Sequence, residues 1–107
     1  MELHLQDVYF EAIRSGTKKI EGRLAKEKYR LLKVGDPIVF TNDAGEKIKK
    51  TIDSIHIFSS FREAFNMLDF KEAVPGVDSL ENAVNIYANF YSLEDQEKHN
   101  VIFLTLN

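Results

Sequence analysis

Residues 14–33 read Arg-Ser-Gly-Thr-Lys-Lys-Ile-Glu-Gly-Arg-Leu-Ala-Lys-Glu-Lys-Tyr-Arg-Leu-Leu-Lys. This run contains eight of the fourteen Lys and Arg residues of the 107-residue chain, but only two acidic residues, Glu21 and Glu27. Its net charge is therefore +6 in a chain whose net charge is −3, and the remainder of the chain carries −9. Such a separation of charge produces a surface field that attracts phosphate-bearing partners.

The centre of this basic run has the alternation of a β-strand. In residues 19–24, apolar or small side chains alternate with charged ones, so one face can join a core while the other presents charges. The first face carries Ile20, Gly22 and Leu24, and the second carries Lys19, Glu21 and Arg23. The charged face is either a ligand-binding surface or a solvated row of ion pairs, and the pattern leaves both interpretations open.

On either side of the run, hydrophobic periodicity and turn residues predict the element order β, α, β, β, β, α, α, β. The predicted strands are about residues 2–5, 18–24, 37–40, 46–58 and 101–106, and the predicted helices are about 7–15, 60–68 and 79–91. Shorter helical turns are expected at 69–73, at 92–97, and within 25–34, where Leu31, Leu32 and Val34 should pack inward. Gly16 is expected to end the first helix in the left-handed conformation, and residues 42–45 should close a hairpin.

The long strand at 46–58 changes its alternation partway along, between Ile52 and Ile55. A change of parity predicts a bulge or bend near Asp53-Ser54, as occurs where a sheet curls into a barrel. The strand at 101–106 follows the helices and must return to the same sheet. The sequence therefore predicts an α+β fold or small barrel, in one domain that spans residues 1–107.

Composition excludes several classes of protein and site. The apolar fraction of 44%, with eight Phe and four Tyr, is enough for a real core. The chain has no cysteine, which excludes disulfides, thiolate zinc sites and a cysteine nucleophile. Its three histidines lack metal-ligand spacing, so we expect neither a metal nor another cofactor. No apolar run approaches the roughly 18 residues of a membrane span, and we expect a cytoplasmic protein.

The runs Ile13–Arg23 and Val34–Phe40 contain Gly-x-Lys-x-x-Glu-x-Arg and Gly-Asp-x-Ile-x-Phe. Together they resemble the ASCH domain family, named for the activating signal cointegrator homology domain. The similarity covers nearly the whole chain. It implies a small PUA-like β-barrel, a curled and mainly antiparallel sheet with helices packed around it. It also implies a cleft between barrel and helices that takes RNA or a nucleoside.

The resemblance also implies possible chemistry. Some small bacterial members of the family are amidohydrolases that remove the acetyl group of N4-acetylcytidine, and others are reported as ribonucleases. The resemblance implies that the catalytic residues of the amidohydrolases are a Lys, a Thr and a Glu. Lys18 falls on the Lys position, Glu21 stands at the Thr position, and Glu63, Glu72 or Glu81 are candidates for the Glu. The replacement at Glu21 predicts weak or absent deacetylation.

The candidate site residues are Lys18, Lys19, Glu21, Arg23 and Tyr29. A buried lysine beside Arg23 has a lowered pKa and can act as a base, whereas an exposed one binds phosphate. Glu21 can accept a hydrogen bond from a base amine, and Arg23 can donate to a phosphate in a fork. Tyr29 either stacks on a base or packs against other side chains of the protein. In an enzyme, Lys18 and Glu21 are the candidate catalytic residues.

Three hypotheses follow for the function. The first is an RNA- or nucleotide-binding domain with a basic cleft. The second is a small hydrolase that acts on a nucleoside or RNA substrate in the same cleft. The third is a protein-interaction module that docks a basic partner through its acidic helices, because residues 69–97 carry a net charge of −6. Tyr87 and Tyr91 are interpreted as core residues with hydroxyls at the surface, and the oligomeric state is left open.

Overall fold

The computed structural model describes residues 1–107 and contains five strands, five α-helices and one 3-10 helix. The strands are β1 (Glu2–His4), β2 (Ile20–Leu24), β3 (Pro37–Thr41), β4 (Lys47–Phe58) and β5 (Val101–Leu106). The helices are α1 (Asp7–Ser15), the 3-10 helix η1 (Glu27–Leu31), α2 (Phe61–Met67), α3 (Phe70–Ala73), α4 (Leu80–Ala88) and α5 (Leu93–His99). None of these helices combines the length and the apolar character that crossing a membrane requires.

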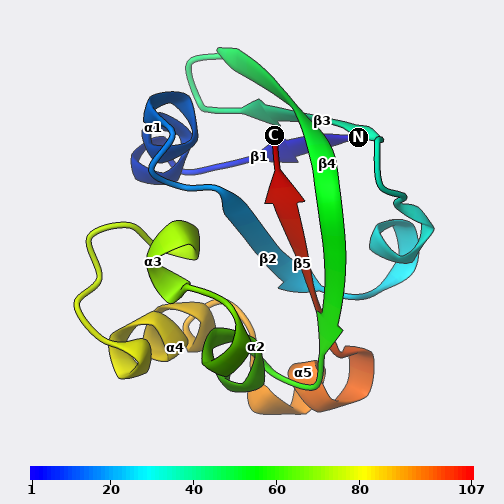
Figure 1. The fold of residues 1–107 in the computed structure, drawn as a ribbon, viewed down its shortest axis with the longest axis vertical. Coiled ribbons are helices and arrows are strands. Elements are labelled where there is room, and N and C mark those ends of the chain that lie inside the picture. Colours follow the sequence, from blue (N-terminus) through cyan, green and yellow to red (C-terminus); the bar gives the residue numbers. More distant parts are fainter.

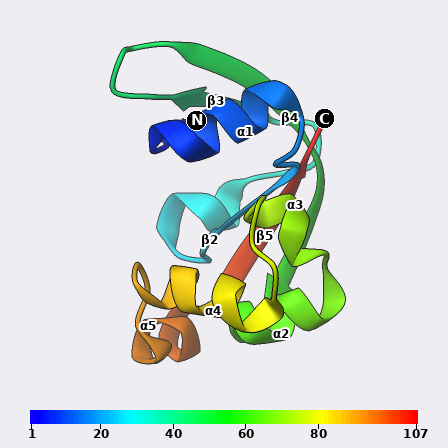
Figure 2. The ribbon, with the colours of Figure 1, turned by 90° about the vertical axis from the view of Figure 1, so that its left-hand side faces the viewer.

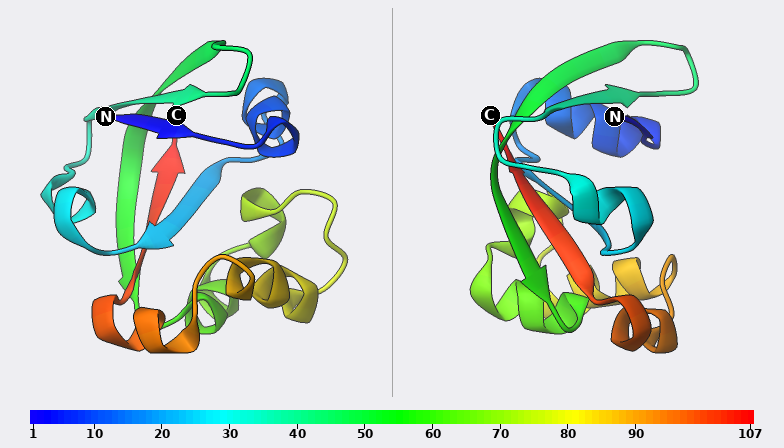
Figure 3. Two further views of the ribbon diagram at one scale, coloured as in Figure 1. Left: turned by 180° about the vertical axis from the view of Figure 1, so that it is seen from behind. Right: turned by 90° about the vertical axis from the view of Figure 1, so that its right-hand side faces the viewer.

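The five strands form one sheet in the order β1-β3-β4-β5-β2, shown in Figure 1. Only the β1–β3 pair is parallel, and the other three pairs are antiparallel. The C-terminal strand β5 lies between β4 and β2, as expected for a strand that returns to complete the sheet. The sheet curls into a half-barrel whose edge strands, β1 and β2, do not pair with each other (Figure 3). The predicted α+β fold with a curled, mainly antiparallel sheet is confirmed.

The predicted irregularity in the long strand is present. The register between β4 and β5 shifts between Ile52 and Ser54. The extra residue changes the parity of β4, so Ile52 and Ile55 both face the cluster inside the half-barrel. Without the shift, Ile55 would point to the opposite face of the sheet. The bulge therefore lets β4 keep its apolar side chains on the same face of the curled sheet before and after the irregularity.

Strand β5 separates two hydrophobic cores. Ile102 and Leu104 face the concave side of the sheet, where α1 contributes Phe10 and Ile13. Val101 and Phe103 face the other side, where helices α2 to α4 pack. All four β5 side chains are at most 2% exposed. In Figure 1 helix α1 lies at one end of the sheet and helices α2 to α5 lie at the other, so β5 connects the two packed regions.

The N-terminal ends of the later helices are capped as their sequences indicate. The hydroxyls of Ser60, Ser79 and Ser92 accept hydrogen bonds from backbone N–H groups in the first turns of α2, α4 and α5. Gly16 ends α1 in the left-handed conformation, with φ of 85°. This turn delivers the chain from α1 into the basic strand β2.

The prediction that Leu31, Leu32 and Val34 pack inward is wrong for two of the three. Leu31 and Val34 are 77% and 64% exposed, and only Leu32 joins the core inside the half-barrel. The reason is that the helical turn is a 3-10 helix that ends at Leu31, with Tyr29 on its inward side. The backbone is extended at Leu32, which packs inward, and Val34 lies beyond the helix in an exposed turn.

Gly22 is required by its neighbour across the sheet. It pairs with Phe103, and a Cβ atom added at Gly22 would lie 2.5 Å from Cζ of that ring.

We predict that Gly22→Ala lowers the free energy of unfolding by about 1–3 kcal/mol through overpacking. Urea denaturation measures it. The double variant Gly22→Ala/Phe103→Leu should be more stable than the sum of the two single effects predicts. Full additivity would show that the two residues do not compete for this space.

Candidate functional site

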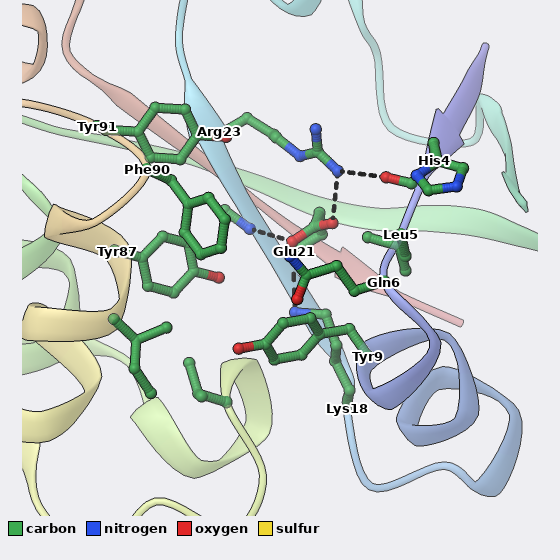
Figure 4. A pocket seen from close by; sticks show the side chains of 13 residues that line it. His4, Leu5, Gln6, Tyr9, Lys18, Glu21, Arg23, Tyr87, Phe90 and Tyr91 are labelled. Carbon is green, nitrogen blue, oxygen red and sulfur yellow. Dashed lines mark hydrogen bonds and ion pairs between the residues drawn. The ribbon is translucent and has the colours of Figure 1, made fainter. Parts of the chain in front are cut away.

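A cleft of about 240 Å³ lies where the half-barrel is left open, between the ends of β1 and β2. Helix α4 and the residues after it form its opposite wall, as Figure 4 shows. Four kinds of residue line it: charged groups on the β2 side, polar groups at the end of β1 and after it, aromatic rings, and aliphatic side chains. They are His4, Leu5, Gln6, Tyr9, Lys18, Glu21, Gly22, Arg23, Val74, Ile86, Tyr87, Phe90 and Tyr91.

Glu21 is the centre of this cleft. It pairs with Leu104 across the sheet, so its side chain points to the concave side, which β1 and α1 cover. The residue is only 4% exposed. One carboxylate oxygen, Oε1, accepts from the Gly22 N–H at 3.1 Å and lies 3.3 Å from Lys18 Nζ. The other, Oε2, accepts from Nη2 of Arg23 at 3.1 Å.

The predicted alternation of β2 is correct, but its charged face is not solvated. Curling of the sheet brings a second layer over that face, and Glu21 becomes part of the interior. Burial alone raises the pKa of Glu21, and the charges of Lys18 and Arg23 more than compensate, so its pKa lies below the ordinary value of 4.5. Glu21 is therefore ionised at neutral pH.

Lys18 is buried beside Glu21, just after the turn at Gly16. Its ammonium donates to the backbone oxygens of Ile20 at 2.8 Å and Ala73 at 2.7 Å, and it contacts Glu21. These three acceptors match its three N–H groups. Burial lowers the pKa of Lys18 and Glu21 opposes that effect. The geometry around Nζ is that of a hydrogen-bond donor that joins β2 to the end of α3.

Arg23 bridges the open seam of the half-barrel. Its Nη2 donates to Glu21 on its own strand and, at 3.4 Å, to the backbone oxygen of His4 on β1. Burial alone lowers the pKa of Arg23, but Glu21 and, after it, the nearby Tyr91 and Tyr29 raise it overall. Both of these hydrogen bonds use Nη2, and the side chain is 22% exposed. Part of the guanidinium donor set therefore faces the cleft.

Two cations share one carboxylate at the floor of the cleft. Lys18, Glu21 and Arg23 together carry a net charge of +1 in a space with little water. A charge imbalance of this kind favours an anionic or strongly polar ligand at the exposed side of Arg23.

The opposite wall of the cleft is aromatic. Tyr87 stacks on Phe61 with ring centroids 4.4 Å apart, and Tyr91 stacks on the same ring at 5.3 Å. Burial, together with Glu21, raises the pKa of both Tyr9 and Tyr87, so their hydroxyls stay protonated. These two hydroxyls point into the cleft (Figure 4), where they can donate to or accept from a ligand.

Sequence reasoning missed this aromatic wall. It assigned Tyr87 and Tyr91 to the core, and they do pack there, but they also face the cleft. Tyr9 and Phe90 were not singled out as site residues. The available indication was the cluster of aromatic residues at 87, 90 and 91 on a predicted helix opposite the basic strand. Periodicity alone assigned that cluster to packing.

The other predicted site residues lie outside the cleft. Lys19 is exposed and lines a shallow groove on another part of the surface. Tyr29 is half-buried against the core of the half-barrel. None of the three candidate insert carboxylates lines the cleft: Glu63 bonds Ser59, Glu81 pairs with Arg62, and Glu72 lies at the same groove as Lys19. The only carboxylate in the cleft is Glu21. No three His, Asp or Glu side chains come together as a metal site.

Comparison with known proteins gives one family and several similar solved structures, of which two are described here. The model of the ASCH domain matches residues 3–106. The crystal structure of hypothetical protein PH0355 is 39% identical, with a TM-score of 0.90 over 99% of this chain and 95% of that one. The solution NMR structure of protein PF0455 from Pyrococcus furiosus is 34% identical, with a TM-score of 0.77 over 99% of this chain and 94% of that one. No curated protein matches the chain.

Removing the charge of Glu21 should destabilise the fold strongly. Glu21→Gln leaves Lys18 and Arg23 buried without their counter-charge, and we expect a loss of about 3–5 kcal/mol in the free energy of unfolding. Urea denaturation at neutral pH measures it. The matched control is Glu81→Gln, which breaks an exposed ion pair with Arg62 and should cost much less. Equal effects of the two substitutions would contradict the assigned importance of burial.

The same carboxylate predicts a loss of stability in acid. Because the pKa of Glu21 in the folded chain lies below 4.5, the unfolded chain binds the proton first as the pH falls. The stabilisation from Glu21 is fully present above about pH 4.5 and is lost as the pH falls through the folded-state pKa. Unfolding free energy measured between neutral pH and about pH 3 should fall more steeply in the native chain than in Glu21→Gln. Parallel curves would assign the acid sensitivity to other groups.

Proposed function

The chain belongs to the ASCH domain family, and from the geometry of its cleft we propose that it binds a nucleotide, either free or as an unpaired residue of RNA. The observation that carries the proposal is the arrangement in one cleft of an aromatic wall opposite the exposed side of the half-buried Arg23. Aromatic side chains stack on unpaired bases, and a guanidinium recognises phosphate through its fork of donors.

The size and chemistry of the cleft suit a ligand part no larger than one nucleotide. Its volume of about 240 Å³ lies just below the roughly 300–1,000 Å³ of small-molecule sites, and a duplex does not enter a space of this size. A base placed against Phe90 and Tyr91 brings its edge toward the hydroxyls of Tyr9 and Tyr87. Reading a single base in this way combines stacking with hydrogen bonds to the base edge.

Binding is favoured over hydrolysis by the residues present. The thirteen residues that line the cleft include no Ser, Thr, Cys or Asp. Lys18 donates to the backbone oxygens of Ile20 and Ala73 and contacts Glu21, so its ammonium is engaged within the protein, although burial lowers its pKa. The carboxylate of Glu21 is already occupied by two cations, and the other polar side chains of the lining are Arg23, His4, Gln6 and three tyrosines.

Binding can be tested with the four ribonucleoside 5′-monophosphates and the corresponding nucleosides, titrated by calorimetry. Arg23→Ala removes a charge-assisted contact worth about 1.5–3 kcal/mol, so we expect roughly 10–100-fold weaker binding of the monophosphates and little change for the nucleosides. The matched control is Lys19→Ala, which removes one positive charge outside the cleft. Equal losses in both variants would show attraction by net charge alone, and no binding of any monophosphate would contradict the proposal.

The aromatic wall gives a separate readout in the same titration. Tyr91→Ala removes a ring from the cleft and should weaken nucleosides and monophosphates alike, by about 1–3 kcal/mol if the ring stacks on the base. Tyr29→Ala is the comparison, because Tyr29 lies outside the cleft lining. A larger loss in Tyr29→Ala would place the base beside η1 instead.

For N4-acetylcytidine, we predict little or no deacetylation. The cleft contains no Ser or Thr, and Lys18 is held as a donor. Incubation of the purified protein with N4-acetylcytidine, followed by chromatography of the released cytidine, checks this. Efficient release that disappears in Glu21→Gln, measured where that variant remains folded, would assign catalysis to the carboxylate and overturn the prediction.

A further inference from the structure

Most of the basic run does not reach the cleft. Lys18 and Arg23 line it, Arg14 pairs with Glu11 and Glu46, and Lys19 lies at a different groove. The other four cations lie on η1 or directly beside it, and all four are exposed outside any ion pair. They are Lys26, Lys28, Arg30 and Lys33. This segment has only one acidic residue, Glu27, so its charge is available to a partner.

The segment is held in a defined conformation. Glu27 has φ of 50°, in the left-handed region that a non-glycine residue adopts only at a cost. Arg30 donates to the backbone oxygen of His99 at 2.9 Å, which ties η1 to the end of α5. Tyr29 and Leu32 pack against the core inside the half-barrel. The exposed lysines therefore project from a fixed turn, and a partner does not have to order this backbone.

The segment also adjoins the cleft. Tyr29 lies close enough to Arg23 and Tyr91 to interact with them electrostatically. Nζ of Lys28 lies 5.5 Å from the centre of the Tyr29 ring. Arg23 and Lys28 therefore both lie near Tyr29. Figure 2 shows η1 (cyan) beside the end of β2 and above α5.

Exposed apolar groups accompany the charges. Leu31 lies one 3-10 turn after Lys28, and Val34 follows Lys33. At 77% and 64% exposed, they are among the most exposed large apolar side chains of the chain. A surface that mixes lysines with apolar side chains suits a ligand with phosphates and unstacked bases, because each part of that ligand finds a partner.

We propose that residues 26–34 bind the backbone of a single-stranded RNA whose neighbouring nucleotide occupies the cleft. The proposal rests on the proposed function and adds that the ligand is a strand and not a free nucleotide. Phosphates contact Lys26, Lys28 and Lys33, and an adjacent base or sugar packs on Leu31. This strip would also attract an anionic membrane, but α5 adjoins it with Glu94, Asp95 and Glu97 exposed. A flat anionic surface would meet those carboxylates, whereas a flexible strand can follow the lysines.

The test compares a triple variant with a control of equal charge. The triple variant is Lys26→Ala/Lys28→Ala/Lys33→Ala. The control is Lys19→Ala/Lys49→Ala/Lys71→Ala, which removes three exposed lysines that form no ion pair and lie elsewhere. The probes are the four ribonucleoside 5′-monophosphates and the four homopolymeric single-stranded RNAs of about seven nucleotides, within the usual site size of single-strand binders.

We expect the native chain to bind its preferred RNA at least about tenfold more tightly than the matching monophosphate at low salt. The triple variant should lose that gain while its affinity for the monophosphate stays within about twofold. Its salt slope should fall by about 2, because each phosphate contact on a single strand contributes roughly 0.7. The control variant should keep both the gain and the slope.

Several outcomes would overturn the inference. If monophosphates bind but the longer RNAs bind no more tightly, the proposed function stands and this extension is wrong. Equal losses in the two triple variants would show attraction by net charge. Lysine-dependent binding to vesicles of phosphatidylcholine and phosphatidylserine, without any effect on RNA, would make the segment a membrane surface. RNA binding that depends on the lysines but is unchanged in Arg23→Ala would separate this surface from the cleft and contradict the proposed function as well.

Discussion

The buried carboxylate of Glu21 is the interaction on which the rest of the structure depends. Its two cations belong to different connections: Lys18 reaches the backbone of Ala73 at the end of α3, and Arg23 reaches the backbone of His4 on β1. The ion cluster therefore joins the curled sheet, the N-terminal strand and the helical insert. Burying three charges is expensive, and here every buried side-chain nitrogen and oxygen has a hydrogen-bond partner. Pairing these three charges fixes the relative positions of the curled sheet, the N-terminal strand and the helical insert.

This constraint explains why the cleft lies where it does. A barrel that closed between β1 and β2 would satisfy the two edges with backbone hydrogen bonds. In this chain the edges stay apart, Arg23 spans the gap to β1, and Lys18 joins β2 to the end of α3. The opening is lined by the same charges that hold it. Support of the fold and recognition of a ligand therefore depend on one group of residues, and the free side of Arg23 is the part that a ligand can use.

The basic run is divided among several tasks by the tertiary structure. Arg14 holds the hairpin through Glu46, Lys18 and Arg23 neutralise Glu21, and the lysines around η1 remain free. The net charge of the basic run treats these residues as one positively charged surface. The folded chain instead presents one small charged cleft and, beside it, an exposed strip, with an acidic helix adjoining the strip. Recognition by such a surface depends on the path of a ligand more than on its total charge.

The sequence by itself determined the elements, and tertiary structure decided what surrounds them. Alternation in β2, the parity change at Asp53-Ser54 and the serine caps are local patterns, because they depend on neighbours within a few residues. They predicted the strands, the bulge and the helices. Local patterns also singled out Lys18, Glu21 and Arg23, which the structure brings together in one cleft.

What those patterns could not show is which face of β2 is covered, because that depends on β1, α1 and α4, which lie far away in sequence. The same limit explains two differences from expectation. Lys19 shares the parity of Glu21 but precedes the strand and lies outside the cleft, and Leu31 is exposed on a 3-10 helix. The assignment of Tyr87 to the core is correct, and only the folded chain shows that Tyr87 also lines the cleft. Burial is a property of the assembled layers, so only the folded chain shows that Glu21 is an interior charge rather than a solvated one.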